Sequence, residues 1–205
     1  MTGGPADWHP SSVTIERGRI LVIRHGQTEW SRAGRHTGRT DIPLTPEGET
    51  RAAALAPRLA GWHPALTLSS PLVRARHTAE LAGFHPEIDV DLLEWDYGDY
   101  EGRTTDEIRE VMGDPDWSVW TTTHGLGETA EQVGERVDRV LARCRPVIEH
   151  GDDCVLVAHA HVLRILTAVW MGMGPRGGEH LVLAAAGTGV LGYERESAAL
   201  RAWNA

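Results

Sequence analysis

An arginine, a histidine and a glycine stand in a row near the N-terminus, at Arg24, His25 and Gly26. They directly follow four aliphatic residues, 20–23, whose unbroken apolar run is typical of a buried strand in a parallel sheet. Ligands bind outside the carboxyl ends of such strands, so a guanidinium and an imidazole at this place are positioned to meet one. Taken alone, the three residues are equally consistent with a strand-end charge pair beside a turn glycine.

Two more side chains of the same kind are expected at the same edge of the sheet. Arg74 falls on the first turn of a helix that follows a predicted strand at 65–68, and His159 follows a predicted strand at 153–158. If these strands are neighbours, two guanidiniums, two imidazoles and two helix N-termini converge on one pocket. Arginine's planar fork and free helix N–H groups both suit phosphate oxygens, so the pattern favours a phosphoryl-binding site. Considered singly, each arginine would be a partner in a surface salt bridge.

The chain also offers a nucleophile and a proton donor. Two nearby arginines disfavour protonation of a histidine, which keeps an imidazole neutral and nucleophilic at neutral pH. Glu94 lies in the segment 92–98, beside aromatic residues that would partly exclude water from its carboxyl group. We therefore expect Glu94 to be the general acid. Outside this pattern, the same residue would be a solvated loop carboxylate.

The elements that must position these residues alternate between strand-like apolar runs and helical patterns, which indicates a sheet flanked by helices. Thr45 and Pro46 predict the start of a helix that Pro57 should bend or end early. Ser70 and Pro71 are predicted to cap the next helix. The expected fold is α/β, a three-layer αβα sandwich with a mostly parallel central sheet.

The second half of the chain continues this alternation. Thr129 is predicted to cap a helix whose far end is limited by Pro146, and a further helix should end at Gly172. Apolar runs that start at Leu181 and Gly189 predict two closing strands. Residues 99–128 are rich in Asp, Thr, Gly and Trp with one short helical stretch, and we expect them to form a lid-like insertion over the pocket.

Length and composition limit the class of protein. At 205 residues the chain fits one domain, expected at 19–205, with a substantial core. Residues 1–18 have neither the basic start nor the apolar stretch of a signal peptide or membrane anchor, and predict a flexible tail. A net charge of −9 argues against nucleic acid as a partner. Two isolated cysteines, Cys144 and Cys154, predict no disulfide framework, which favours a reducing, cytoplasmic location. The oligomeric state, a homodimer included, stays open.

Several separate segments, in the same order along the chain, resemble the histidine phosphatases related to cofactor-dependent phosphoglycerate mutase. The resemblance covers most of residues 19–195. It implies the phosphoglycerate mutase-like form of the αβα sandwich. The segments that carry it are residues 21–30, 36–48, 69–75, 94–102, 127–129 and 157–159.

The resemblance also implies roles for the residues already singled out. His25 would take the phosphoryl group, and Glu94 would protonate the leaving oxygen. The phosphoryl oxygens would be bound by Arg24, Arg74 and His159. A phosphohistidine would form and water would hydrolyse it, with no metal and no organic cofactor. Substrate contacts are expected at Thr28, Ser31, Thr37, Gly38, Tyr97, Ala160 and His161.

The chain departs from the mutases at positions that bear on the reaction. Ser31 stands where the mutases usually carry asparagine, and a hydroxyl can still donate to a phosphate oxygen. His161 replaces a frequent glycine and is expected at the pocket mouth. Thr105 stands where the mutases carry a lysine that helps to hold phosphoglycerate, and residues 106–128 contain no paired arginines for a substrate carboxylate. Because a mutase must retain its product for retransfer, these departures favour simple hydrolysis.

The prediction is therefore a metal-independent phosphomonoesterase for a small phosphorylated metabolite, whose identity the sequence does not give. Phosphoglycerate mutase is the nearest alternative within the family. A zinc hydrolase that uses His159 and His161 is a second alternative, although arginines beside a metal would oppose its binding. A non-catalytic phosphoryl-binding module is a third, and such modules usually lack the nucleophile or the acid.

Overall fold

The computed structural model describes residues 17–122 and 124–205. The tail predicted at 1–18 therefore lies outside the described residues, except for its last two. The strands are β1 (Ile20–Arg24), β2 (Leu66–Ser69), β3 (Glu87–Ile88), β4 (Cys154–Ala158), β5 (Thr188–Glu194) and β6 (Ser197–Trp203). The α-helices are α1 (Glu29–Arg32), α2 (Pro46–Ala53), α3 (Leu55–Leu59), α4 (Val73–Leu81), α5 (Thr105–Met112), α6 (Ala130–Glu149) and α7 (Ala160–Trp170). Short 3-10 turns lie at η1 (Val90–Leu92), η2 (Gly98–Tyr100) and η3 (Pro175–His180).

The strands form one mixed sheet in the order β3-β2-β4-β1-β5-β6. Strands β3, β2, β4 and β1 are parallel to one another, whereas β5 is antiparallel to β1 and β6 is antiparallel to β5. The mostly parallel sheet predicted from the sequence is confirmed. Arg24 lies opposite Ala158, and Ser69 lies opposite Val157. The carboxyl ends of β1, β4 and β2 consequently lie side by side.

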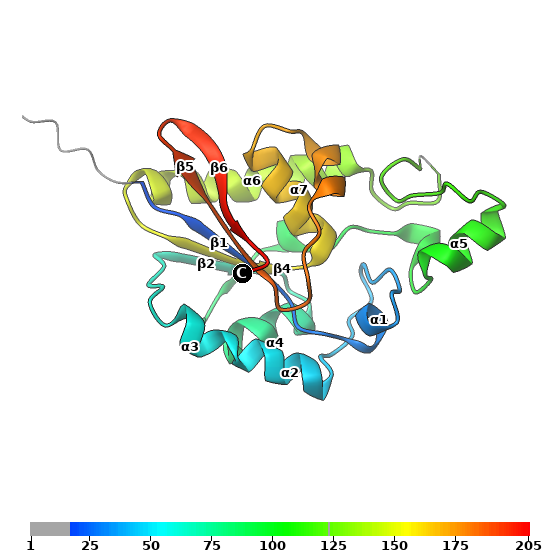
Figure 1. The fold of residues 1–205 in the computed structure, drawn as a ribbon, viewed down its shortest axis with the longest axis horizontal. Coiled ribbons are helices and arrows are strands. Elements are labelled where there is room, and N and C mark those ends of the chain that lie inside the picture. The colour runs from blue at the N-terminus through cyan, green and yellow to red at the C-terminus, as the bar shows by residue number, and fades with distance from the viewer. Residues whose placement is uncertain (1–16, 123) are drawn as a thin grey trace, which may run out of the picture.

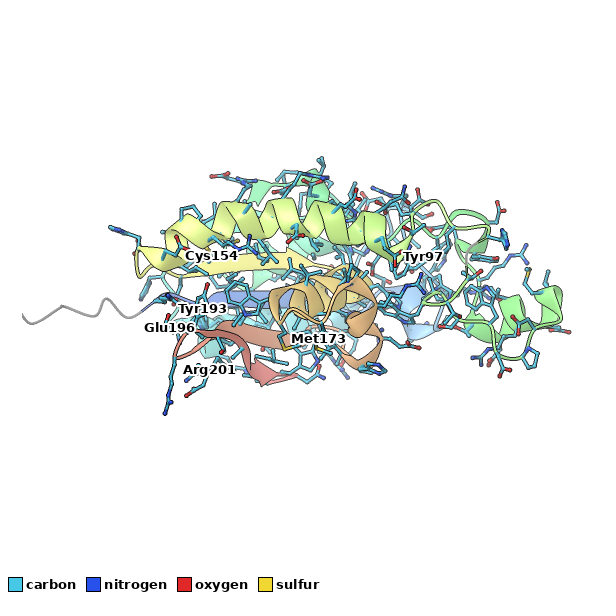
Figure 2. The ribbon with its side chains drawn as sticks, turned by 90° about the horizontal axis from the view of Figure 1, so that it is seen from above. Tyr97, Cys154, Met173, Tyr193, Glu196 and Arg201 are labelled. Carbon is cyan, nitrogen blue, oxygen red and sulfur yellow. The ribbon has the colours of Figure 1, made fainter. Side chains whose placement is uncertain are left out.

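Two hydrophobic cores, one on each face of the sheet, make the sandwich. Successive side chains of a strand point to opposite faces, and β1 follows this rule. Ile20 and Val22 belong to the core that α6 and α7 cover, whereas Leu21 and Ile23 belong to the core on the face of α3 and α4. Figure 1 shows these helices on the two sides of the sheet, and Figure 2 shows α6 and α7 lying over it from above. Residues 20–23 of the strand are all apolar because both of its faces are buried.

Two proline predictions meet different outcomes. The helix that begins at Pro46 is interrupted at Ala54, three residues before Pro57, so the predicted bend is confirmed. Pro57 lacks an N–H and its ring clashes with the carbonyl four residues earlier, which breaks the helix upstream of the proline. The limit predicted at Pro146 is wrong, because α6 continues to Glu149. Ile148 is fully buried on this last turn, so packing favours the helix despite the proline.

Two other predicted boundaries also need correction. The N-cap of α4 is Leu72 rather than Ser70, and no side chain caps this helix. The apolar run from Leu181 is not a strand; β5 begins at Thr188 and the second closing strand is β6. Cys144 and Cys154 are buried and free, as predicted. Among the described residues, no helix is both long and apolar enough to cross a membrane.

Candidate active site

A cavity of about 220 Å³ lies at the carboxyl end of β1. It gathers side chains from loops and helices that are far apart in the sequence. Eight of the twelve site residues expected from the sequence line it: Arg24, His25, Ser31, Thr37, Glu94, Tyr97, Ala160 and His161. The other four, Thr28, Gly38, Arg74 and His159, do not line it.

His25 is held as a neutral imidazole with one nitrogen free. Its Nδ1 lies 2.6 Å from the carbonyl oxygen of Gly26. Because a carbonyl only accepts, Nδ1 carries the proton and Nε2 keeps its lone pair. Burial lowers the pKa of His25 well below its ordinary value, and the charges of Arg74 and Arg24 lower it further. The arrangement leaves a nucleophilic nitrogen at neutral pH.

Arg24 retains donors for a ligand. Its Nη1 donates to the carbonyl oxygen of Leu183 at 2.5 Å, whereas its buried Nε has no hydrogen-bond partner among the described residues. A buried donor without a partner costs free energy, so an anion that accepts from it would bind favourably. Burial lowers the pKa of this guanidinium, with Glu94 opposing the effect, and the group stays charged.

Arg74 and His159 form a fully buried pair behind the cavity. Nε of Arg74 donates to Nδ1 of His159 at 3.1 Å, and its two Nη atoms donate to three backbone carbonyls of residues 37–40 at 2.9 to 3.2 Å. Nδ1 of His159 therefore accepts, and Nε2 donates to the hydroxyl of Ser70 at 2.7 Å. The rings of His159 and His25 are 5.1 Å apart. Burial, then the charge of Arg74, lowers the pKa of His159.

Glu94 is buried, as its aromatic neighbours predicted, with only 3% of its surface exposed. The sequence did not predict its hydrogen bonds. Oε1 accepts from the backbone N–H groups of Trp95 at 3.0 Å and Val162 at 2.9 Å, and Oε2 accepts from that of His161 at 3.1 Å. The carboxylate thus binds the N-terminus of α7, where N–H groups and the helix dipole stabilise negative charge and offset its burial.

Tyr97 and His161 form one wall of the cavity. The hydroxyl oxygen of Tyr97 lies 2.6 Å from Nδ1 of His161. Burial raises the pKa of Tyr97 well above its ordinary value, with the charge of Glu94 adding to the effect, so the phenol keeps its proton. Burial, then the charge of Arg164, lowers the pKa of His161. Trp120 lies behind His161, with ring centroids 5.2 Å apart, so this wall is aromatic and neutral.

The loop residues expected to touch substrate divide into two groups. Ser31 and Thr37 line the cavity. Thr28 is fully buried, and its hydroxyl oxygen accepts from the N–H of Ser31 at 3.1 Å as the cap of α1. The N–H of Gly38 donates to both carboxylate oxygens of Glu101 at 2.9 Å. The geometry gives Thr28 and Gly38 a place in holding the loop and does not support a substrate contact at either.

Six cavity residues were not singled out from the sequence: Gly34, Arg35, His36, Arg164, Val182 and Leu183. His36 lies in a motif that resembles the family, and its pKa is lowered by burial. Arg164 lies three residues after His161 on α7, a spacing that places both on one face of the helix. That spacing could have identified Arg164 as a cavity residue from the sequence. No sequence feature identifies Val182 and Leu183 in this way, because their apolar run predicted a strand.

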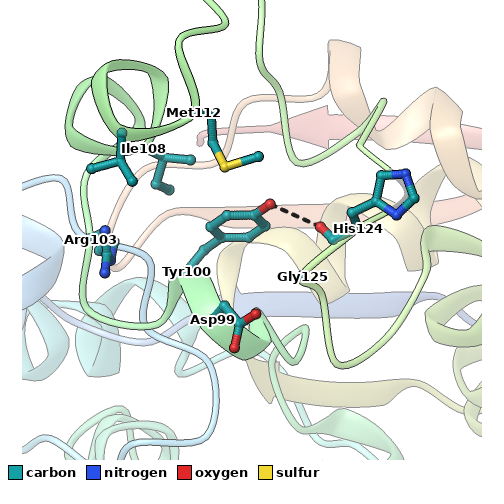
Figure 3. Close-up of a pocket in the computed structure, with 8 residues that line it drawn as sticks. Asp99, Tyr100, Arg103, Ile108, Met112, His124 and Gly125 are labelled. Carbon is teal, nitrogen blue, oxygen red and sulfur yellow. Dashed lines mark hydrogen bonds between the residues drawn. The ribbon is translucent and has the colours of Figure 1, made fainter.

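The segment 99–128 contributes α5 and a second cavity of about 280 Å³ (Figure 3). The rings and aliphatic chains of Tyr100, Ile108 and Met112 line it, with Asp99 and Arg103 at its polar side. None of the predicted site residues lines this second cavity.

Zinc binding by His159 and His161 is not favoured by this geometry. The ring nitrogens of His159 are engaged with Arg74 and Ser70, and Nδ1 of His161 is engaged with Tyr97. Within residues 17–122 and 124–205, no group of three or more His, Cys, Asp or Glu side chains is placed to hold a metal ion. Arg24 lines the same cavity as His161, and Arg74 donates to His159, so a positive charge beside each histidine would oppose a metal ion.

Comparisons with known proteins agree on one family for this chain. The family model described as the histidine phosphatase superfamily, branch 1, matches residues 20–205. An acid phosphatase from Mycobacterium tuberculosis is 39% identical over 186 residues, which cover 88% of this chain and 89% of that protein. Sedoheptulose 1,7-bisphosphatase from Saccharomyces cerevisiae is 35% identical over 185 residues, covering 76% and 68% of the two chains.

A solved structure shares the fold. It is the product of an open reading frame of Mycobacterium tuberculosis, superimposes with a TM-score of 0.85 at 35% sequence identity, and covers 91% of this chain and 97% of its own. The mixed six-stranded sheet flanked by helices is thus of the phosphoglycerate mutase-like type.

Proposed function

The chain belongs to the histidine phosphatase superfamily, branch 1, and from that membership we propose that it is a metal-independent phosphomonoesterase acting on a small phosphorylated metabolite. The observation that carries the proposal is the pairing of two groups in one cavity. His25 offers an unprotonated Nε2, because the carbonyl of Gly26 holds the proton on Nδ1. Glu94 lines the same cavity with a buried carboxyl group.

In the proposed first step, the lone pair of His25 Nε2 attacks phosphorus in line with the leaving group. The bond between phosphorus and the leaving oxygen breaks, and Glu94 gives that oxygen its proton. In the second step Glu94, now ionised, takes a proton from water, whose oxygen attacks phosphorus and releases His25.

Charge on the transferring group would be stabilised by Arg24, Arg74 and His159. The unpartnered Nε of Arg24 supports this role most directly. Arg74 uses four of its five N–H donors on protein acceptors, which leaves one on Nη1. His159 would bind an oxygen as a neutral imidazole, by turning to the phosphoryl group the Nε2 proton that it gives to Ser70, while Nδ1 keeps the hydrogen bond from Arg74.

The substrate is proposed to be compact. The cavity of about 220 Å³ is smaller than the roughly 300 to 1,000 Å³ typical of ligand pockets. Ser31, Thr37, Tyr97, Ala160 and His161 are proposed to contact its leaving group. A sugar phosphate fits this setting, in line with the name of the yeast relative. The segment 99–128 is proposed as a lid of a single domain, and the cytoplasm as the location.

Hydrolysis rather than isomerisation is proposed because residues 106–128 carry no paired arginines for a substrate carboxylate. A panel of phosphomonoesters, assayed with and without a chelator, tests this. It should include sugar phosphates, an aryl phosphate, and 3-phosphoglycerate with its bisphosphate. Phosphate release that survives the chelator is expected. Isomerisation of phosphoglycerate would indicate a mutase. Loss of activity with the chelator would indicate a metal site, and the absence of any turnover would indicate a binding module.

A further inference from the structure

One buried arginine holds the backbone of the segment that carries Glu94. Arg136, in the second turn of α6, is only 6% exposed. Its Nη1 donates to the carbonyl oxygens of Asp91 at 2.7 Å and Leu93 at 2.6 Å, and its Nη2 donates to that of Glu94 at 3.1 Å. A single guanidinium thus fixes three carbonyls within residues 91–94, the last of them the backbone carbonyl of Glu94 itself.

Glu128 holds the other side of the same segment. Its carboxylate pairs with Arg136, at 2.9 Å from Nε and 3.2 Å from Nη2. The same carboxylate accepts from the N–H of Asp96 at 3.0 Å, and the carbonyl of Glu128 accepts from the indole N–H of Trp95 at 2.7 Å. The Arg136–Glu128 pair therefore forms hydrogen bonds with the chain both before Glu94 and after it.

Such a pair is an inefficient way to stabilise a fold. Removing two charges from water carries a desolvation cost, and a well-packed apolar pair of similar volume often does as well. The segment, however, needs donors and acceptors that no strand supplies. After η1 it runs outside the sheet to η2, so its carbonyls have no ladder partners. The guanidinium fork satisfies several of these carbonyls at once in a fixed geometry.

We propose that Arg136 and Glu128 are positioning residues that hold the carboxyl group of Glu94 in place for proton transfer to the leaving oxygen. The inference rests on the proposed function, and it adds to it two residues that line neither cavity. Among the described residues, the Glu94 carboxyl accepts hydrogen bonds from backbone N–H groups alone: that of Trp95, in the segment that the pair holds, and those of His161 and Val162 at the start of α7. Its place relative to His25 therefore depends on the backbone that the pair holds as well as on α7.

The proposal predicts a loss that depends on the leaving group. An alkoxide from a sugar or alkyl phosphate departs poorly without a proton, whereas an activated aryl oxide such as p-nitrophenolate departs as the anion. Displacement of a catalytic group by about 1 Å costs roughly 100-fold in rate. We expect Arg136→Lys and Glu128→Gln to lower kcat/KM for an alkyl phosphate by about 10- to 100-fold, and that for p-nitrophenyl phosphate by less than about 3-fold.

Both variants keep the size of the side chain, and kcat/KM reports the steps up to departure of the leaving group. Arg139→Lys is the matched control. Arg139 lies one turn further along α6 and pairs with the side chain of Asp91 at 2.7 Å, but it does not touch the backbone of the acid-bearing segment. Glu94→Gln shows how kcat/KM for each substrate falls when the general acid itself is lost. Thermal melting shows whether each variant is folded.

A loss confined to the alkyl phosphate in Arg136→Lys and Glu128→Gln, matching Glu94→Gln and absent from Arg139→Lys, supports the proposal. Equal losses on both substrates, or no loss in the folded variants, would overturn it and leave the pair a structural role. A wild-type enzyme that hydrolyses neither substrate refutes the proposed function itself. An active wild type in which Glu94→Gln shows no dependence on the leaving group refutes the role of Glu94, and the positioning role with it.

Discussion

Replacing Ser70 with alanine tests why a hydroxyl is buried at this position. Local sequence favours an N-cap, yet the structure places its oxygen 2.7 Å from Nε2 of His159, with both residues fully buried. Because Arg74 donates to the other nitrogen, Nε2 carries the proton, and Ser70→Ala leaves this N–H without a partner. An unsatisfied buried donor costs about 1–3 kcal/mol in the free energy of unfolding.

A cost of that size is measurable but does not by itself identify the cause. For a domain of about 200 residues each 1 kcal/mol lowers Tm by roughly 2–4 °C, so we expect a decrease of about 2–12 °C. Loss of an N-cap would cost a similar amount, about 0.5–2 kcal/mol. A double-mutant cycle with His159→Leu separates the two explanations, because only the hydrogen bond couples Ser70 to His159.

Urea unfolding followed by tryptophan fluorescence gives the four free energies of this cycle. We expect a coupling of about 1 kcal/mol or more, with Ser70→Ala costing less than about 0.5 kcal/mol in the His159→Leu background. Ser69→Ala is the control, since its equally buried hydroxyl donates to the carbonyl of Ser70 at 3.0 Å and should be additive with His159→Leu. Additivity of Ser70→Ala with His159→Leu would refute the hydrogen-bond account.

Three other outcomes are expected. The free energy of unfolding should decrease as pH falls through about 6.5. Burial and nearby cations lower the pKa of His25, His159 and His161 in the folded protein, so the unfolded chain binds more protons in this range. Urea unfolding at several pH values checks this, and a free energy that does not change with pH would contradict it. Gly38→Ala should cost about 1–3 kcal/mol, measured by thermal unfolding, because the new Cβ would lie 2.6 Å from a backbone oxygen. Leu141→Ala should cost about 2–5 kcal/mol in urea unfolding, since this fully buried side chain packs in the α6 core; a loss below 1 kcal/mol would argue against that packing.

The central strands and the residues at their ends were predictable because parallel, doubly buried strands have a distinctive pattern. The runs that became β1 and β4 are continuously apolar, and only their carboxyl ends carry Arg24, His25 and His159. A sheet that buries both faces requires this composition. Because β1 and β4 are adjacent and parallel in the sheet, their carboxyl ends lie side by side.

Contacts between distant segments were not predictable, and they decide most of the site's electrostatics. Ser70 obeys a local capping rule in sequence, but a partner 89 residues away competes for its hydroxyl. Glu94 was expected in an apolar setting, and its carboxyl instead receives backbone N–H groups from residues 161 and 162. The hydrogen bond of Arg24 was not predictable either. Its Nη1 donates to the carbonyl oxygen of Leu183, which lies in an apolar run that the sequence predicted to be a strand.

The central claim is that Nε2 of His25 becomes phosphorylated during turnover. The most direct test is to mix enzyme with substrate, quench in alkali, where the nitrogen–phosphorus bond survives, and map the modified peptide by mass spectrometry. We predict one phosphoryl group on His25, and loss of both the label and turnover in His25→Ala. Turnover in His25→Ala at the wild-type rate, or a phosphoryl group carried by another residue, would contradict the account.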